Sequence, residues 1–571
     1  MIARKDFLTE ATFQRARFEA LHKGDLALPW LFRPVRVKIL MVVDGYVGNF
    51  LNVSFGQSYF GLSGVLDTLA NTADSWVRFD VTKAHRQTDP LGEADFSGFR
   101  FTQAGFDINA FDQVWLFGAR SSETDIDRLT DQELAVLTRW MDEKKGGVFA
   151  TGDHSDLGAS LCARVPRVKS MRKWTVAQGV PSPTGVNRHD TLLPGHNTTY
   201  TFDDESDDIP MVTDVEMFPV RSWHPFRHAS GPHPVLCGKK GIIKILPDHP
   251  HEGEVITPAS YTQTFGFPGY INKPEFPEKT AFPGTREKAF IIAKATVTAR
   301  TASQDTNKQA VNGKTFGAIG AYNGHVGGVG RVVVDSTWHH WFDVNLLGRP
   351  GLPASNPKSL GFLASASGIE AYAKIQNYFR NVALWLSSPS KQDALFFRAT
   401  WGIVQLYPLV EQLSSKLPIW ELGGYALDAI GREAGQCTVR TWLLDRFDFL
   451  FEEKFRVPGG DPCLSCPPFD AFEIVVLGSI VRELIVINEQ AQSKNEIMKE
   501  ATVAKAFAAG LSQGSKEFIE LLNRSVENAT AFAKILQRKE SANFSGSQFM
   551  NDDRAVAPKA AKQAKAKKPA K

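Results

Sequence analysis

Three short segments of the sequence carry side chains suited to acid–base chemistry, and each follows a run of apolar residues. The candidate residues are Asp44 after the first run, Asp153, His154, Ser155 and Asp156 after the second, and Ser336, Thr337, Trp338, His339 and His340 after the third. A histidine near carboxylates can act as base, acid, nucleophile or metal ligand near neutral pH. The three segments therefore predict an acid–base site wherever the fold brings them together.

In an enzyme, these residues would divide into reacting and binding groups. His154 would be the central acid, base or nucleophile, and Asp153 or Asp44 would orient it. His339 and His340 would act from the opposite side. The substrate would be bound by the remaining side chains: Ser155, Asp156, Ser336, Thr337 and Trp338. In the alternative interpretation, Ser155 or Asp156 caps the next helix and the histidines only complete hydrogen bonds.

A second cluster of histidines and carboxylates lies in LPDHPHEGE (246–254). Alternate residues of an extended segment point to one side, so His249, His251 and Glu252 could hold a divalent metal that activates water. If a metal is bound, His154 and His340 are equally good candidate ligands. The spacing matches no established metal motif, and histidines flanked by prolines are commonly structural, so both interpretations stay open.

Alternating strands and helices must position the first two segments. The pattern predicts strands at 35–43, 75–84, 111–119 and GVFATG, with helices at 59–73 and 129–147. The second helix begins with a capping box of Thr130 and Glu133. This alternation predicts an α/β fold with a doubly wound parallel sheet. Ligands bind at the carboxyl ends of the strands in such sheets, so the three segments should share one edge.

Composition divides the rest of the chain. The stretch 165–325 is dense in Pro, Gly, His and Asp. A strand followed by a polar turn at 330–348 and a helix at 369–388 then restore the regular pattern. Helical spacing without strand alternation follows Pro389. The expected parts are a helical lead-in (1–33), an α/β domain (34–390) with a long insertion (about 165–325), an all-α domain (393–540) and a disordered Lys/Ala-rich tail (541–571).

Composition also limits the class of protein. The chain has 571 residues, 43% apolar and 22% charged, which is typical of soluble globular proteins with more than one domain. Its five cysteines fit a reducing cytoplasm better than a disulfide framework. The first residues lack a continuous apolar core, and no stretch of about 18 uncharged apolar residues is present. The sequence therefore predicts a cytoplasmic protein without a membrane span.

The positive charge is concentrated at the end of the chain. The net charge is +3, but residues 554–571 carry six Lys, one Arg and no acid, which gives +7 and leaves −4 for the remainder. Such a tail could bind an acidic partner or nucleic acid through charge alone, without reading sequence. The alternative is a solvated tail without a partner. The oligomeric state is left open.

Two further motifs are weak. Cys463 and Cys466 form a CxxC without a second pair, and neither a zinc site nor a thioredoxin-like unit is indicated. The Gly-rich run GHVGGVG (324–330) is interpreted as a loop that feeds the late strand. No strand clearly precedes this run and no helix follows it, so it does not predict a dinucleotide-binding turn.

The segment GGVFATGDHSD resembles the nucleophile-elbow region of class I glutamine amidotransferase-like domains, whose pattern is Gly-x-Cys-x-Gly. It is closest to the trehalose-utilisation (ThuA-like) branch, in which a Gly-rich run enters a strand that ends in His. GVGRVVVDSTWHH is similar to the late strand of that branch, and IQNYFRNVALWL is similar to its closing helix. The resemblance covers about 35–390 and implies a flavodoxin-like fold.

The chain departs from the amidotransferase pattern at its reacting positions. His154 stands at the cysteine position and Asp156 at the second glycine. Cys162 lies two helical turns further along, too far to replace the thiol. His340 is followed by Asp343 at a longer spacing than in the His-x-Glu motif. A glutaminase thiol and its thioester chemistry are therefore absent, and the chain is not a standard amidotransferase.

Two hypotheses about function follow. The first is a hydrolase- or isomerase-like enzyme that acts on a small polar substrate, for example a carbohydrate, with or without a divalent metal. The second is a non-catalytic ligand-binding or scaffold protein built on a degenerate amidotransferase-like domain. The first predicts that the three segments meet within hydrogen-bond reach in an open cleft. The second predicts histidines buried against apolar side chains, or a cleft filled by the insertion.

Overall fold

The structure is a computed structural model of the chain. It describes residues 33–45, 53–121 except 59, 73 and 90, 128–180, 186–187, 210–221, 228–247, 253–297, 299, 310, 312–348, 351, 353, 359–406, 415–446, 469–494 and 499–540. The chain forms two compact units, Met1–Gly514 and Ser515–Lys571. The lead-in 1–32, the candidate metal ligands His249, His251 and Glu252, the CxxC and the basic tail lie outside the described residues.

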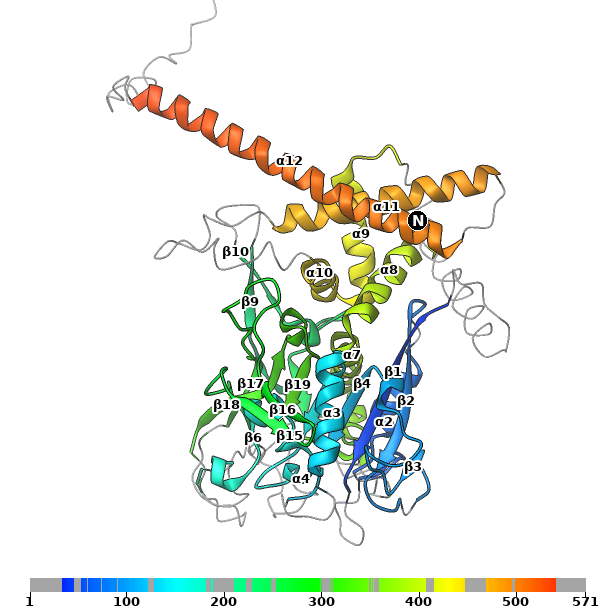
Figure 1. Ribbon diagram of the computed structural model, residues 1–571, viewed down its shortest axis with the longest axis vertical. Helices are drawn as coiled ribbons and strands as arrows, with labels where there is room; N and C mark the ends of the chain where they lie inside the picture. The colour runs from blue at the N-terminus through cyan, green and yellow to red at the C-terminus, as the bar shows by residue number, and fades with distance from the viewer. Residues whose placement is uncertain are drawn as a thin grey trace, which may run out of the picture. The chain divides into compact units, whose positions relative to one another are not determined.

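A mixed sheet with eleven described strands forms the centre of the α/β domain (Figure 1). Six of these strands are parallel and follow the order β3-β2-β1-β4-β5-β19. Their bounds are β1 Val35–Val43, β2 Val77–His85, β3 Phe96–Ser97, β4 Gln113–Phe117, β5 Gly147–Thr151 and β19 Val332–Asp335. The order β2-β1-β4-β5-β19 is the 2-1-3-4-5 order of flavodoxin-like sheets. The predicted α/β fold class is therefore confirmed.

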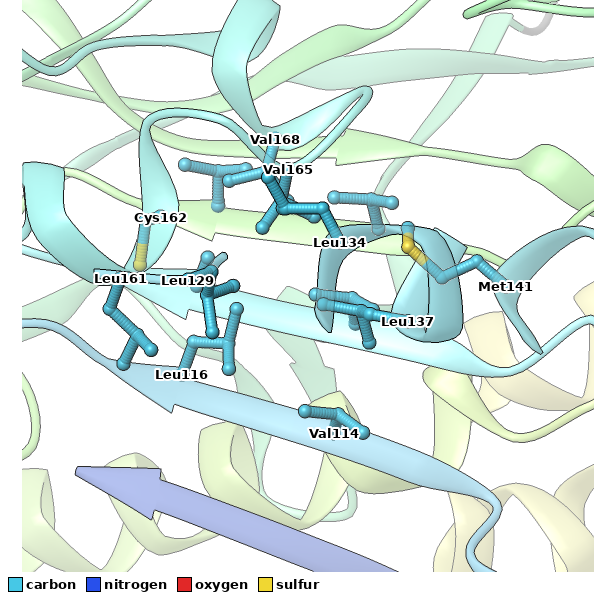
Figure 2. Packing of buried hydrophobic residues seen from close by; sticks show 14 of the residues in the cluster. Val114, Leu116, Leu129, Leu134, Leu137, Met141, Leu161, Cys162, Val165 and Val168 are labelled. Carbon is cyan, nitrogen blue, oxygen red and sulfur yellow. The ribbon is translucent and has the colours of Figure 1, made fainter. Parts of the chain in front are cut away.

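Alternate residues of β4 show why the sheet is covered on both faces. Val114 and Leu116 pack in one core cluster with Leu134 and Leu137 of α3 (Asp131–Glu143) (Figure 2). The side chain of Gln113 points to the other face and donates to a backbone carbonyl of α7 (Ala366–Leu386). Successive strand residues point to opposite faces, so a run that is apolar at every position needs a helix on each side.

The capping box predicted for the second helix is present in α3. Thr130 Oγ1 accepts from the Glu133 amide at 3.2 Å, and Glu133 Oε2 accepts from the Thr130 amide at 3.0 Å. Glu133 also forms an ion pair with Arg86, and both side chains are buried. The cap therefore fixes the start of α3, and its Glu133 also pairs with the charge of Arg86, which follows β2.

The insertion adds antiparallel strands to the same sheet. These strands are β6 Arg172–Lys173, β8 Asp214–Val215, β14 Glu254–Val255, β17 Phe290–Val297 and β18 Lys314–Tyr322. The sequence did not predict β18, because KTFGAIGAY is rich in Gly and Ala, which are poor strand formers. The statement that no strand precedes 324–330 is therefore wrong. The Gly-rich run nevertheless joins two antiparallel strands, β18 and β19, and no helix follows it directly.

The remaining elements are short pairs of strands and helices. The two-stranded pairs are β7 Pro210–Val212 with β13 Ile245–Pro247, β9 Met217–Arg221 with β10 His228–Pro232, β11 Cys237–Gly238 with β12 Gly241–Ile242, and β15 Thr264–Phe267 with β16 Tyr270–Pro274. The short helices are α2 Ser63–Ala70, α4 Ala159–Cys162, α5 Val168–Met171 and α6 Asp343–Leu346, with 3-10 turns at 108–110, 176–178, 234–236, 324–327 and 361–364.

A helical region follows the α/β domain, as the sequence predicted. Its helices are α8 Pro389–Leu406, α9 Ile419–Ala434, α10 Gln436–Leu444, α11 Phe469–Lys494 and α12 Glu500–Glu540. The last of these continues from the first compact unit into the second. Across the part of the chain that the structure describes, none of the helices has the length and apolarity needed to cross a membrane.

Candidate functional site

The segments that follow β5 and β19 meet at one edge of the sheet, around the carboxylate of Asp153. His154 Nδ1 lies 2.9 Å from Asp153 Oδ2, and Thr337 Oγ1 donates to Asp153 Oδ1 at 3.3 Å. The Nε2 atom of His339 lies 3.7 Å from the same Oδ2. Strands β5 and β19 are parallel neighbours, so their carboxyl ends are adjacent and residues far apart in the sequence come together.

An arginine from the insertion holds the two segments in place. Arg172 Nη2 donates to the backbone carbonyl of Asp153 at 2.8 Å and to that of Ser336 at 2.7 Å. Its guanidinium also lies 4.3 Å from the ring centroid of Trp174. Arg172 is fully buried. Nothing in the sequence marked this residue, because its partners are backbone atoms of segments that lie elsewhere in the chain.

The turn after β5 differs from the predicted elbow. The left-handed residue is Ser155, with φ of 52°, and not His154. The chain then turns back, with the Asp153 amide donating to the Leu157 carbonyl at 2.9 Å, and α4 begins only at Ala159. Gly158 has φ of 99°, and a Cβ there would lie 2.7 Å from the Cα of Gly152, so only glycine fits. His154 therefore lies in a tight loop and not in the first turn of a helix.

Exposure and charge distinguish the members of this cluster. The His154 side chain is 17% exposed, whereas those of Asp153 and His339 are 0% and 1% exposed. Burial raises the pKa of Asp153, but the charge of His339 and the hydrogen bond with His154 outweigh this effect. The pKa of Asp153 therefore lies well below its usual value, and the group remains a carboxylate that orients the partly exposed imidazole of His154.

The second pair in the late segment, Asp335 and His340, is completely buried. His340 Nδ1 lies 2.8 Å from both oxygens of Asp335. Trp341 Nε1 donates to Asp335 Oδ2 at 3.0 Å, and the Tyr378 hydroxyl of α7 donates to the same oxygen at 2.7 Å. Both Asp335 and His340 have 0% exposure. The Asp335 carboxylate therefore accepts hydrogen bonds from three side chains inside the core.

Asp44 lies at the carboxyl end of β1, where the strand order reverses between β1 and β4. Its Oδ1 accepts from the backbone amide of Ala119 in the segment that follows β4. Burial raises the pKa of Asp44 from 3.8 to about 7, although hydrogen bonds from the amides of Ala119 and Arg120 lower it. The side chain of Asp44 is thus hydrogen-bonded to the segment that follows β4, and β4 is separated from β19 by β5.

The remaining predicted side chains have local structural contacts. Asp156 Oδ1 accepts from the Val176 amide at 2.7 Å. The ring of Trp338 is buried and packs at 5.5 Å from Phe342. Thr337 links the segments, as described above. The Ser336 hydroxyl is buried and has no hydrogen-bond partner among the described residues.

Asp343 and Cys162, which were considered because of the resemblance to amidotransferase-like sequences, also have structural contacts. Asp343 accepts from the Ser63 hydroxyl at 2.7 Å and from the Gly64 amide at 2.8 Å, so it caps the start of α2. Cys162 is fully buried on the α3 face of the sheet (Figure 2), and burial raises the pKa of its thiol. Neither group is placed to act as a nucleophile or as its partner.

A metal site was predicted from His249, His251 and Glu252, which lie outside the described residues. Within the described ranges, no group of three or more His, Cys, Asp or Glu side chains is arranged to hold a metal ion. The metal prediction for 246–254 therefore stays a prediction.

Sequence reasoning missed two residues that organise this edge, Arg172 and Tyr378. Arg172 lies in the irregular insertion and Tyr378 in an amphipathic helix, so neither stood out in the sequence. Their roles follow from the hydrogen bonds that they donate to Asp153 and Asp335. Comparison of the chain with protein-family models, with curated proteins and with solved structures gave no match.

Proposed function

We propose that the α/β domain is an enzyme in which His154 transfers protons during hydrolysis or isomerisation of a small polar substrate. Asp153 is the carboxylate that orients this imidazole. The single observation that carries the proposal is their geometry: a fully buried carboxylate lies 2.9 Å from the ring nitrogen of a histidine whose side chain is partly exposed. A base oriented by a second group is the usual arrangement for acid–base catalysis.

The electrostatics support this assignment. The pKa of Asp153 lies well below its usual value, so the group carries a negative charge at neutral pH. A fixed negative charge beside an imidazole stabilises the imidazolium that forms when His154 accepts a proton. Thr337 and Arg172 hold Asp153 through its side chain and backbone, so the carboxylate cannot easily turn away from His154.

The resemblance to amidotransferase-like domains supports the position of the reaction but not its type. In the ThuA-like interpretation, His154 occupies the place of the missing cysteine at the end of β5, and the flavodoxin-like strand order is consistent with that relationship. Since no thiol lies there, a glutaminase thioester is not part of the proposal. A divalent metal bound by 249–252 would add a Lewis acid that activates water.

The proposal is tested by screening for turnover. The purified chain is incubated with sugars, sugar esters, sugar phosphates and simple carboxylic esters, with and without Zn²⁺ or Mn²⁺, and product formation is followed by NMR. For any substrate found, His154→Ala should lower kcat by about 100- to 10,000-fold. Asp153→Asn should lower kcat less. A His154→Ala variant with the kcat of the parent would refute the assignment.

A matched control removes an imidazole at the opposite edge of the sheet. His325 lies in the turn before β19, whereas His154 follows the end of β5. His325→Gln should retain the kcat of the parent. An equal loss of kcat in both variants would indicate a general loss of folded protein and not a chemical role for His154.

A second candidate function is a ligand-binding or scaffold protein. The burial of His339 and His340, at 1% and 0% exposure, favours it, because a buried imidazole has no access to a substrate. In that case the basic tail would recruit an acidic partner or nucleic acid. Ligand binding by calorimetry without turnover, together with salt-sensitive binding to heparin that is lost when 541–571 is removed, would support this candidate.

A further inference from the structure

Two cysteines from distant parts of the chain meet on the side of the α/β domain that contacts the helical region. Cys237 begins β11 in the insertion, and Cys437 lies in the first turn of α10. The two thiols are hydrogen-bonded to each other, and the backbone N–H of Cys437 donates to the sulfur of Cys237. Neither thiol is bonded to another sulfur. The proposed acid–base site does not use this pair.

The surrounding packing fixes the two backbones against each other. Asn381 of α7 donates from Nδ2 to the carbonyl of Cys237 at 3.1 Å. Gly435, which precedes α10, lies so close that a Cβ there would be 2.6 Å from the same carbonyl oxygen. The Thr441 hydroxyl donates to the carbonyl of Cys437 at 3.0 Å. The contact between the thiols is therefore built into the fold, and it is not a chance approach of surface side chains.

The two sulfurs are chemically unequal. Donation from the Cys437 thiol lowers the pKa of Cys237 to about 7 in spite of burial, with help from the Cys437 amide and the charge of Arg440. The pKa of Cys437 is raised, first by its hydrogen bond to Cys237 and then by burial. A backbone N–H can only donate, so its direction shows that Cys237 is the acceptor. The start of a helix also favours a negative sulfur.

We propose that Cys237 and Cys437 form a redox-active dithiol that closes to a disulfide by exchange with a small disulfide such as oxidised glutathione. The thiolate of Cys237 attacks one glutathione sulfur, and the other glutathione leaves as a thiolate. Cys437 then loses its proton to solvent, and its sulfur attacks the sulfur of Cys237 and expels the second glutathione. Two protein thiols are oxidised, and one glutathione disulfide is reduced to two thiols.

The product would tie the insertion to the helical region. Cys237 is 8% exposed and Cys437 is half-buried, so a small reagent reaches the pair only from the Cys437 side or by a local opening. A bond between β11 and α10 closes a long loop in the unfolded chain, which raises the midpoint of thermal unfolding. The dithiol is thus a site of reversible oxidative modification.

The experiment uses the full chain with Cys463→Ser and Cys466→Ser, because that CxxC is a second dithiol. The folded protein is incubated with oxidised glutathione at neutral pH, quenched with N-ethylmaleimide, digested and mapped by mass spectrometry. We expect a peptide that links Cys237 to Cys437 and disappears on reduction. In Cys437→Ala, Cys237 should accumulate as a mixed disulfide with glutathione. In Cys237→Ala, modification of Cys437 should fall by about tenfold or more.

A control and a pH profile complete the test. Cys162→Ser should behave like the parent, because Cys162 is buried in the core of the sheet domain. Alkylation of Cys237 in Cys437→Ala should titrate at a pH above that of Cys437→Ser, whose hydroxyl can still donate. The proposal is overturned if both thiols stay free in the folded protein while the urea-unfolded chain is oxidised. It is also overturned if Cys437 forms the mixed disulfide equally well without Cys237.

Discussion

Two aspartate–histidine pairs lie at the adjacent ends of β5 and β19, and they differ in exposure and in the number of donors that each carboxylate accepts. Asp153 faces His154, whose side chain is 17% exposed. Asp335 faces His340, and both are fully buried. The same residue types at the same sheet edge therefore give one pair that solvent can reach and one that it cannot.

The difference shows that an Asp–His pair is not by itself a catalytic unit. Asp335 accepts from His340, Trp341 and Tyr378, so its charge is used to satisfy buried donors of the core. Asp153 accepts from His154 and Thr337 and leaves the imidazole partly in solvent. Exposure of the imidazole decides which pair has access to solvent, which the proposed function requires. The following substitutions test this contrast.

The largest effect is expected for Asp335→Ala. The substitution leaves three buried donors without their acceptor, so the free energy of unfolding should fall by about 3–5 kcal/mol. Urea titration followed by tryptophan fluorescence measures this loss. Asp156→Ala is the matched control, because Asp156 accepts one backbone amide at the surface of the same edge. Its cost should be about 0.5–1.5 kcal/mol. Equal losses in the two variants would contradict a structural role special to Asp335.

The next largest effect is the pH dependence of stability in Asp44→Asn. Unlike Asp153 and Asp335, Asp44 has no histidine partner among the described hydrogen bonds. The folded pKa of Asp44 is raised from 3.8 to about 7. The folded state therefore loses stability as the pH rises from about 4 to about 7, while the unfolded carboxyl is already ionised. Asp44→Asn removes this titration, so from about pH 5 to about pH 8 the variant should gain about 3 kcal/mol relative to the parent.

The pKa of Asp153 is shifted in the opposite direction from that of Asp44, and the same measurement of stability against pH tests it. Its folded pKa is lowered, so its stabilising contribution is complete above the unfolded value and is lost only as the pH falls below about 4. Asp153→Asn should therefore leave the slope between about pH 5 and about pH 8 unchanged. Unfolding curves at several pH values distinguish the two. A pH-independent difference between Asp44→Asn and the parent would show that Asp44 is ionised in the folded state.

A smaller effect is expected for Tyr378→Phe, which removes one of the donors to Asp335. The loss should be about 1.5–3 kcal/mol, because the hydrogen bond is to a buried charge. Tyr322→Phe is a close control. Tyr322 is fully buried, and its hydroxyl has no hydrogen-bond partner in the described part of the chain. That variant should match or exceed the stability of the parent. Calorimetric unfolding of both variants checks the comparison.

The smallest effect on stability is expected for His154→Ala. Its side chain is partly in solvent, and Thr337 and His339 still face Asp153 after its removal. The free energy of unfolding should change by about 1 kcal/mol or less. A loss as large as that of Asp335→Ala would show that His154 is a structural residue like His340, and the contrast between the two pairs would fail.

The sequence by itself determined several elements of the sheet domain and the edge that their polar segments share. The largely apolar runs at 35–43 and GVFATG became β1 and β5, because strands covered on both faces bury consecutive residues. The Thr130–Glu133 cap set the start of α3 through contacts only three residues apart. Parallel pairing then placed the segments after β5 and β19 side by side. Local spacing is sufficient for the strands and the cap, whereas the shared edge follows from the alternation of strands and helices.

Only the tertiary structure decided which of the candidate side chains are available for chemistry. Exposure separates His154 from His340, and it depends on α7, whose Tyr378 lies 43 residues beyond Asp335. Arg172 likewise anchors backbone carbonyls that are distant in the sequence, and burial by the folded chain raises the pKa of Asp44. Burial and hydrogen bonding between remote segments have no local pattern, so the roles of these residues followed from packing and not from spacing.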